Sequence, residues 1–210
     1  MKKNICIEGI KGTGKSTLVE QVVTDKSILK GGVSVFGITK PITVPDLLEE
    51  AHAKLTALRS DDLFLERLFI RRAVFNQLKV DKRAEMIIGD RSVITAYVTR
   101  WNKWGDPWYT VKRVSGQYKN IIQPDVIIWL NLKADEAIKH IVKRNKIRLR
   151  PDDETITLLE SASDTYEELL KGRIYSKIIG KCEVVELKCK GDFEGLNEEI
   201  KNIIKYYKQK

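Results

Sequence analysis

The glycine-rich segment at residues 9–17 restricts the fold more than any other feature of this chain. It reads Gly-Ile-Lys-Gly-Thr-Gly-Lys-Ser-Thr and fits the pattern G-x-x-x-x-G-K-[S/T] at every fixed position. An apolar stretch at residues 4–8 precedes it, and a helical pattern begins near Lys15. This strand–loop–helix context predicts a P-loop, in which backbone N–H groups and a helix N-terminus surround phosphates.

Each residue type in this loop has a physical reason. Glycines adopt positive φ and let the backbone come close to a ligand, so we expect both properties at Gly9, Gly12 and Gly14. We expect Lys15 to place its charge on the β- and γ-phosphates of ATP and Ser16 to offer its hydroxyl to Mg²⁺. Thr17 is expected to help cap the helix. The predicted nucleotide-binding residues are Gly9, Lys11, Gly12, Thr13, Gly14, Lys15, Ser16 and Thr17.

Short apolar segments alternate with longer amphipathic ones along the whole chain. This alternation predicts βαβ units and a three-layer α/β/α domain with a five-stranded parallel sheet. A length of 210 residues is consistent with a single domain spanning residues 1–210. The strands are predicted at 4–8, 33–39, 86–89, 126–130 and 183–187. The main helices are predicted from Lys15, over 63–80, 134–144 and 152–171, and from about Asp192.

The strand at residues 86–89 ends at a carboxylate, Asp90, which is followed at once by Arg91. A carboxylate at the end of a strand beside a P-loop can reach Mg²⁺ directly or through water, so Ser16 and Asp90 form the predicted metal site. A guanidinium binds phosphate through two parallel hydrogen bonds. Arg91 is therefore suited to an acceptor phosphate.

Two further basic segments are candidates for phosphate binding. Residues 144–150 read Arg-Asn-Lys-Ile-Arg-Leu-Arg and precede Pro151. Such a loop could close over the phosphates and exclude water, so a lid is predicted at about 144–152, with a solvated surface loop as the alternative. The helix at 63–80 carries Arg67, Arg71 and Arg72, and we expect one of them to face the cleft.

Composition and motifs exclude several other classes. The net charge is +9, but the lysines are spread along the chain and mixed with acids, which does not favour nucleic acid as the partner. No run of 18 apolar residues predicts a membrane span, and the N-terminus does not read as a signal peptide, so a cytoplasmic protein is expected. A GTPase would need Asn-Lys-x-Asp, and residues 145–148 read Asn-Lys-Ile-Arg.

The chain resembles the thymidylate kinase family and, more broadly, the deoxynucleoside and nucleoside-monophosphate kinases. The resemblance covers most of the chain. The P-loop is highly specific for the class, and the other segments are moderately specific for the family. The matching segments are Ile7-Glu8-Gly9 with the P-loop, Phe64-Leu65-Glu66-Arg67, Asp90-Arg91-Ser92 with Thr95-Ala96-Tyr97, the strand from Pro124 to Leu130, and the arginine-bearing loop.

The resemblance implies a Mg²⁺-dependent kinase that transfers phosphate from ATP to a nucleoside monophosphate, with dTMP or a related deoxynucleotide as acceptor. It implies a small-molecule nucleotide partner and a possible homodimer. The implied catalytic residues are Lys15, Asp90, Arg91, Arg148 and Arg150, with one lid arginine clamping the transferred phosphoryl group. The implied or inferred acceptor-binding residues are Lys40, Phe64, Arg67, Arg71, Arg91 and Tyr97.

Two departures from the thymidylate kinase pattern and one from the nucleoside kinase pattern leave alternatives open. Lys11 stands where an acid usually contacts the deoxyribose, and Ser92 makes the segment similar to the Glu-Arg-Ser of deoxynucleoside kinases. Lys40 precedes Pro41 where nucleoside kinases carry a glutamate base, which favours a monophosphate acceptor. A deoxynucleoside kinase, with a base among Asp46, Glu49 and Glu50, is the first alternative. A P-loop ATPase or a regulatory protein that binds nucleic acid or a protein partner is the second.

Overall fold

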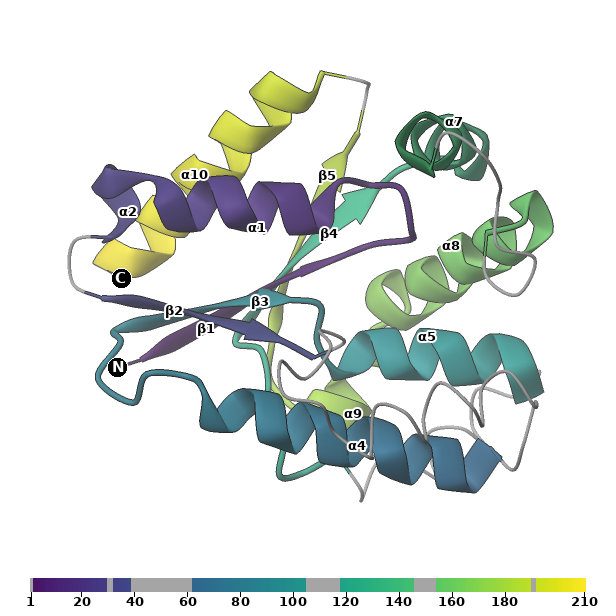
Figure 1. The fold of residues 1–210 in the computed structure, drawn as a ribbon, viewed down its shortest axis with the longest axis horizontal. Helices are drawn as coiled ribbons and strands as arrows, with labels where there is room; N and C mark the ends of the chain where they lie inside the picture. Colours follow the sequence, from purple (N-terminus) through teal and green to yellow (C-terminus); the bar gives the residue numbers. More distant parts are fainter. Residues whose placement is uncertain (1, 30–31, 39–61, 105–117, 146–153, 190–191) are drawn as a thin grey trace.

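A computed structural model describes residues 2–29, 32–38, 62–104, 118–145, 154–189 and 192–210. Five parallel strands form one sheet in the order β2-β3-β1-β4-β5 (Figure 1). The strands are β1 (Lys3–Glu8), β2 (Val33–Gly37), β3 (Met86–Asp90), β4 (Val126–Asn131) and β5 (Glu183–Lys188). The central position of β1 places Ile7 opposite Asp90 of β3 and Glu8 opposite Trp129 of β4. The five-stranded parallel sheet predicted from the sequence is confirmed.

Helices cover both faces of the sheet, which confirms the three-layer α/β/α architecture. Figure 1 shows α1 and α10 on one face and α4, α5 and α8 on the other. The described helices are α1 (Lys15–Thr24), α2 (Lys26–Leu29), α4 (Asp62–Leu78), α5 (Val93–Trp104), α7 (Ala134–Asn145), α8 (Ile156–Lys171), α9 (Ser176–Ile179) and α10 (Phe193–Gln209). Side chains are described from Ile70 onward in α4 and as far as Val98 in α5.

The core is divided by the sheet, because successive side chains of a strand point to opposite faces. Ile5, Ile7 and Ile88 pack with apolar residues of α1 and α10. Ile127 and Trp129 pack on the other side, with apolar residues of α5 and α8. Both faces of the central strands are therefore buried, as expected for a parallel sheet between two helical layers. No helix within the described ranges is long and apolar enough to span a membrane.

Two details of the predicted helices are wrong. Helix α8 does not begin at residue 152, because Glu154 and Thr155 precede it and the Thr155 side chain accepts a hydrogen bond from the N–H of Leu158. This side-chain cap satisfies an N–H of the first turn and so fixes the start. Thr17 does not cap α1 either. The N-cap of α1 is Gly14, and no side chain caps it.

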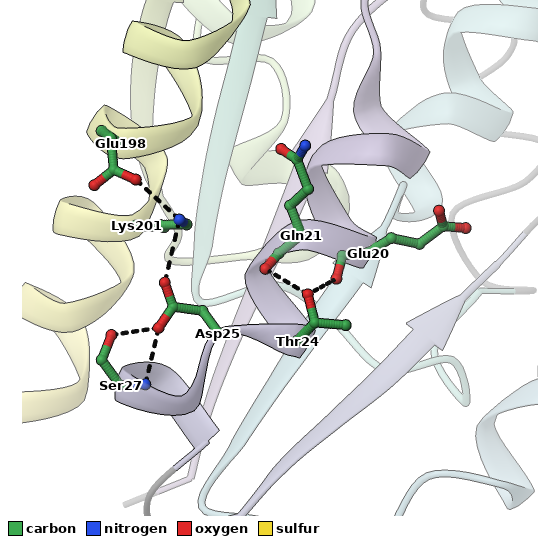
Figure 2. A network of polar contacts seen from close by, with 7 residues as sticks. All are labelled: Glu20, Gln21, Thr24, Asp25, Ser27, Glu198 and Lys201. Carbon is green, nitrogen blue, oxygen red and sulfur yellow. Dashed lines mark hydrogen bonds and ion pairs between the residues drawn. The ribbon is translucent and has the colours of Figure 1, made fainter.

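A polar cluster holds α10 against the turn between α1 and α2 (Figure 2). Lys201 of α10 lies 3.1 Å from the carboxylate of Asp25 and 2.9 Å from that of Glu198. Asp25 also accepts hydrogen bonds from the N–H and the hydroxyl of Ser27, at 2.8 and 2.6 Å. The hydrogen bonds from Ser27, followed by that from Lys201, lower the pKa of Asp25 from its usual 3.8 to about 2. The cluster therefore favours the ionised form of Asp25 in the folded protein.

This depressed pKa predicts how Asp25 contributes to stability as the pH changes. Above pH 3.8 the carboxylate is charged in both states and its stabilising contribution is complete. As the pH falls toward 2, the unfolded chain takes up the proton first and the contribution is lost. Asp25→Asn should therefore lower the thermal midpoint by a few degrees at pH 7 and by less at pH 3. A constant difference down to pH 3 would contradict this assignment. Glu198→Gln, which alters the more exposed partner of Lys201, serves as the matched control.

Candidate functional site

The loop between β1 and α1 has the conformation that its glycines were expected to allow. Gly9, Gly12 and Gly14 have φ values of 147°, 85° and 82°. Because Gly14 caps α1 in the left-handed conformation and no side chain caps the helix, its first N–H groups remain available to an anion. This is the arrangement that binds phosphate at a helix N-terminus.

Helix α7 supports this loop from the side. A Cβ atom added to Gly12 would lie 2.5 Å from the carbonyl oxygen of Ala137, so only glycine allows the loop to approach the helix this closely. One turn later, Nδ1 of His140 lies 2.9 Å from the carbonyl oxygen of Gly12. The spacing of Ala137 and His140 places both on one face of α7, but the sequence does not reveal that this face meets the loop. Sequence analysis therefore missed His140.

Lys15 is buried, and its ammonium group turns back onto the loop. Nζ donates to the carbonyl oxygen of Ile10 at 2.5 Å and to the hydroxyl of Thr13 at 2.8 Å. Burial lowers the pKa of Lys15 well below its usual value, and the positive charge of Arg91 lowers it further. A bound phosphate would favour the charged form and so oppose both effects. The geometry thus fits the predicted role of Lys15 as the phosphate-binding cation.

Ser16 and Asp90 meet as predicted, with 2.8 Å between the serine hydroxyl and Oδ2 of the carboxylate. The other oxygen, Oδ1, is buried and finds no hydrogen-bond partner among the described residues. A buried carboxylate oxygen without a partner is costly in an apolar environment but suits a hard cation. Mg²⁺ is usually held by one or two protein oxygens together with water and substrate phosphates. Ser16 and Asp90 therefore fit the magnesium ion that the motif implies.

Replacing Asp90 with asparagine tests this pair, because the amide keeps the size of the side chain and removes its charge. We expect Mg²⁺ to strengthen ATP binding to the unaltered protein and to have little effect on Asp90→Asn. Calorimetric titration of ATP with and without Mg²⁺ measures the difference. Asp135→Asn, at an exposed position of α7, is the matched control and should behave like the unaltered protein. An unchanged Mg²⁺ effect in Asp90→Asn would show that the metal lies elsewhere.

Arg91 follows Asp90 in an uncommon backbone conformation. Its φ is 72°, in the left-handed region that residues other than glycine rarely adopt. Nη1 of its guanidinium lies 3.2 Å from Oγ1 of Thr95 and 3.5 Å from the carbonyl oxygen of Gly9. Backbone strain of this kind persists only where surrounding contacts hold it, and it is concentrated at functional sites. Arg91 is thus held beside the loop, as its predicted contact with phosphate requires.

Lys15, Ser16 and Arg91 line one pocket of about 710 Å³, a volume suited to a nucleotide. Lys143 and Arg144 of α7 also line it, together with the more apolar Cys189, Phe193 and Leu196. The lining residues are Lys11, Gly12, Thr13, Gly14, Lys15, Ser16, Thr17, Arg91, Leu132, His140, Lys143, Arg144, Cys189, Asp192, Phe193 and Leu196. All the predicted nucleotide-binding residues except Gly9 therefore line it, and Gly9 contributes the carbonyl facing Arg91.

The structure describes only some of the residues that were predicted to bind the acceptor. Arg71 is exposed on α4 and is not among the residues that line this pocket. Tyr97 is fully buried in the core, with its ring centroid 5.6 Å from that of Tyr118, so it does not line the pocket either. The described residues do not include Lys40, Arg148, Arg150 or most of the predicted lid. They also leave out the side chains of Phe64 and Arg67.

Comparison with solved structures shows the fold over nearly the whole chain. A deoxyadenosine kinase from M. mycoides with bound dATP is 20% identical, with a TM-score of 0.67 over 96% of this chain and 99% of that one. A second structure of that kinase, with the products dCMP and a flexible dCDP, is also 20% identical, with a TM-score of 0.68 over 97% of this chain and 99% of that one. No protein-family model and no curated protein sequence matches the chain.

Proposed function

We propose that this chain is a Mg²⁺-dependent kinase that transfers the γ-phosphoryl group of ATP to a deoxynucleoside. One observation carries the proposal. Residues 11–17 of the P-loop and Arg91 line one pocket, Asp90 is bonded to Ser16 of that loop, and a deoxyadenosine kinase shares the fold over nearly the full length of the chain. This likeness favours the nucleoside acceptor over dTMP, which the resemblance to thymidylate kinases implied.

In this proposal the chain positions the reactants and balances their charge. The loop N–H groups hold the β- and γ-phosphates, while Lys15 and Arg91 lie close enough to neutralise charge on the transferred group. Ser16 and Asp90 would hold Mg²⁺, which would supply positive charge against the charge that develops on the phosphates. A hydroxyl oxygen of the acceptor forms the new bond to phosphorus, the bond to the oxygen of ADP breaks, and the hydroxyl proton passes to a base.

Glu8 is not available as this base, although it lies next to the P-loop. Its side chain is fully buried, and each carboxylate oxygen already accepts two hydrogen bonds. The candidates are therefore the three acids that the sequence places after the second strand, Asp46, Glu49 and Glu50, which lie outside the described residues. Replacing each in turn by its amide should leave ATP binding unchanged, and the base should be the one whose loss abolishes transfer.

A nucleoside monophosphate remains the second candidate acceptor because of Lys40. A protonated lysine is a poor base for a hydroxyl and a good ligand for phosphate. A monophosphate already carries a nucleophilic oxygen and needs no strong base. The two candidates therefore differ in whether the acceptor must lose a proton to a carboxylate.

A coupled ADP-release assay with Mg·ATP and a panel of deoxynucleosides, ribonucleosides and nucleoside monophosphates decides between them. Turnover with deoxynucleosides supports the proposal, and turnover with monophosphates alone replaces it with the second candidate. ATP hydrolysis that needs no acceptor, together with salt-dependent binding of nucleic acid, would support a P-loop ATPase or regulatory protein. Lys15→Met protein, assayed in parallel, measures any contaminating kinase.

A further inference from the structure

The carboxylate of Glu8, at the end of β1, is fully buried and lies where three elements meet. Oε1 accepts hydrogen bonds from the backbone N–H and the hydroxyl of Ser92, both at 2.6 Å. Oε2 accepts from the hydroxyl of Thr95 at 2.7 Å and from that of Tyr166, on α8, at 2.8 Å. Four donors are aimed at one carboxylate, so Glu8 is the acceptor in all four hydrogen bonds.

The direction of these hydrogen bonds determines what Thr95 offers to Arg91. A hydroxyl group has one proton to donate, and Thr95 directs its proton to Glu8. Toward Arg91 its oxygen therefore acts as an acceptor, and Nη1 of Arg91 donates to it from 3.2 Å away. Tyr166, whose hydroxyl oxygen lies 3.0 Å from that of Thr95, also donates to Glu8. Glu8 thus determines the direction of donation in a chain of hydrogen bonds that ends at the Arg91 guanidinium.

The same strand also fixes the backbone on both sides of Arg91. The N–H of Arg91 donates to the carbonyl oxygen of Ile7 at 3.1 Å, and the next N–H, that of Ser92, donates to Glu8. The Ser92 hydroxyl donates to Glu8 and accepts from the N–H of Ile94, so it also caps the first turn of α5. These contacts hold the left-handed conformation of Arg91, whose φ is 72°.

The negative charge of Glu8 has a second effect, on the two cations beside the pocket. Arg91 and Lys15 are two cations beside one pocket, and the positive charge of Arg91 lowers the pKa of Lys15 after burial has already lowered it. The negative charges of Glu8 and Asp90 act in the opposite direction. Because Glu8 is buried and fully hydrogen-bonded, it can offset this repulsion without occupying the phosphate site.

We propose that Glu8 is a positioning residue that aims the Arg91 guanidinium at the phosphate pocket through the hydroxyl of Thr95. The consequence for catalysis rests on the proposed kinase function, whereas the consequence for the orientation of Arg91 does not. Tyr166 brings α8 into the same network. A one-ångström displacement of a positioning group costs about 10²-fold in rate, so loss of the Thr95 acceptor should lower kcat/KM for the acceptor by about 10–100-fold.

The experiment compares Thr95→Val, which removes the hydroxyl at nearly constant size, with Thr95→Ser, which keeps it. The first readout is the ¹⁵N NMR spectrum of the arginine side chains, in which the Arg91 signals are assigned by their loss in Arg91→Lys protein. Thr95→Val should shift these signals to the values of a freely rotating guanidinium, and Thr95→Ser should leave them in place. Glu8→Gln, if it folds, should act like Thr95→Val. Its amide N–H₂ can donate to Thr95 and turn the hydroxyl proton toward Arg91.

The second readout is steady-state kinetics with the best acceptor. We expect Thr95→Val to lose transfer activity while its Kd for Mg·ATP stays unchanged, and Thr95→Ser to restore most of that activity. A Thr95→Val protein with unshifted Arg91 signals would overturn the proposal, whatever its activity. If no acceptor supports turnover in the unaltered protein, the proposed function fails. The NMR comparison then still decides whether Glu8 and Thr95 position Arg91.

Discussion

Lys15→Met is expected to abolish phosphoryl transfer, lowering kcat by at least about 10²–10³-fold, the usual loss when one preorganised donor to a developing charge is removed. Methionine retains the length and much of the volume of the buried side chain while removing its charge and its hydrogen bonds to Ile10 and Thr13. Because charge-assisted hydrogen bonds contribute about 1.5–3 kcal/mol, the affinity for Mg·ATP should also fall by roughly 10–150-fold.

Titration calorimetry with Mg·ATP and the ADP-release assay measure the two effects separately. Lys139→Met is the matched control, because Lys139 is 66% exposed on α7 and pairs only with its helix neighbour Glu136 in the interactions described. The control should retain full activity. Normal ATP binding by Lys15→Met would show that the Lys15 ammonium group does not contact the phosphates.

Arg91→Ala should have the second large effect, and it should fall on a different step. We expect ATP binding near that of the unaltered protein and transfer to the acceptor lowered by about 10²–10³-fold. The reason is that Arg91 lies at the edge of the phosphate pocket, joined to Thr95 and Gly9, rather than within the loop that holds the donor. The contrast between Lys15→Met and Arg91→Ala therefore separates donor binding from transfer.

Arg173→Ala is a close control for Arg91→Ala, because Arg173 is exposed and is the other residue besides glycine with positive φ among those described, at 56°. Both variants lose a guanidinium group, and both place an alanine in the left-handed region. They differ in that Arg91 is half-buried, contacts Thr95 and Gly9 and lines the pocket, whereas Arg173 is exposed and does not line it. Equal kinetic losses in both would mean that backbone strain, rather than the guanidinium, explains the effect.

The parts of the site that could be predicted from sequence are those set by local geometry. The spacing of Gly9, Gly12 and Gly14 requires a particular loop, and a carboxylate at the end of β3 lies next to that loop in any parallel sheet that pairs β1 with β3. The pairing of Ser16 with Asp90 follows from these two facts. The five-stranded sheet was predictable for a similar reason, since alternating strands and helices allow few arrangements.

The parts that could not be predicted depend on which helix faces meet across the sheet. His140 and Phe193 reach the loop from α7 and α10, more than 120 residues away, and their spacing in sequence is that of ordinary amphipathic helices. Tyr97 is a different case. The family resemblance implied a contact with the acceptor, and the structure shows that α5 buries Tyr97 in the core, away from the described pocket, so the contact stays a prediction.

The position of β1 in the sheet has a consequence for how the protein matures on the ribosome. The phosphate loop lies within the first 17 residues, yet the neighbours of its strand are β3 and β4, which end at residues 90 and 131. Helix α10 comes later still, and its Lys208 donates to the carbonyl oxygen of Ile28, 180 residues earlier. The strand that carries the phosphate loop is therefore completed by strands and a helix that follow it in the sequence. A nascent chain should gain the ability to bind nucleotide only after α10 has been synthesised, and shortening α10 should impair a site that lies far from it in the sequence.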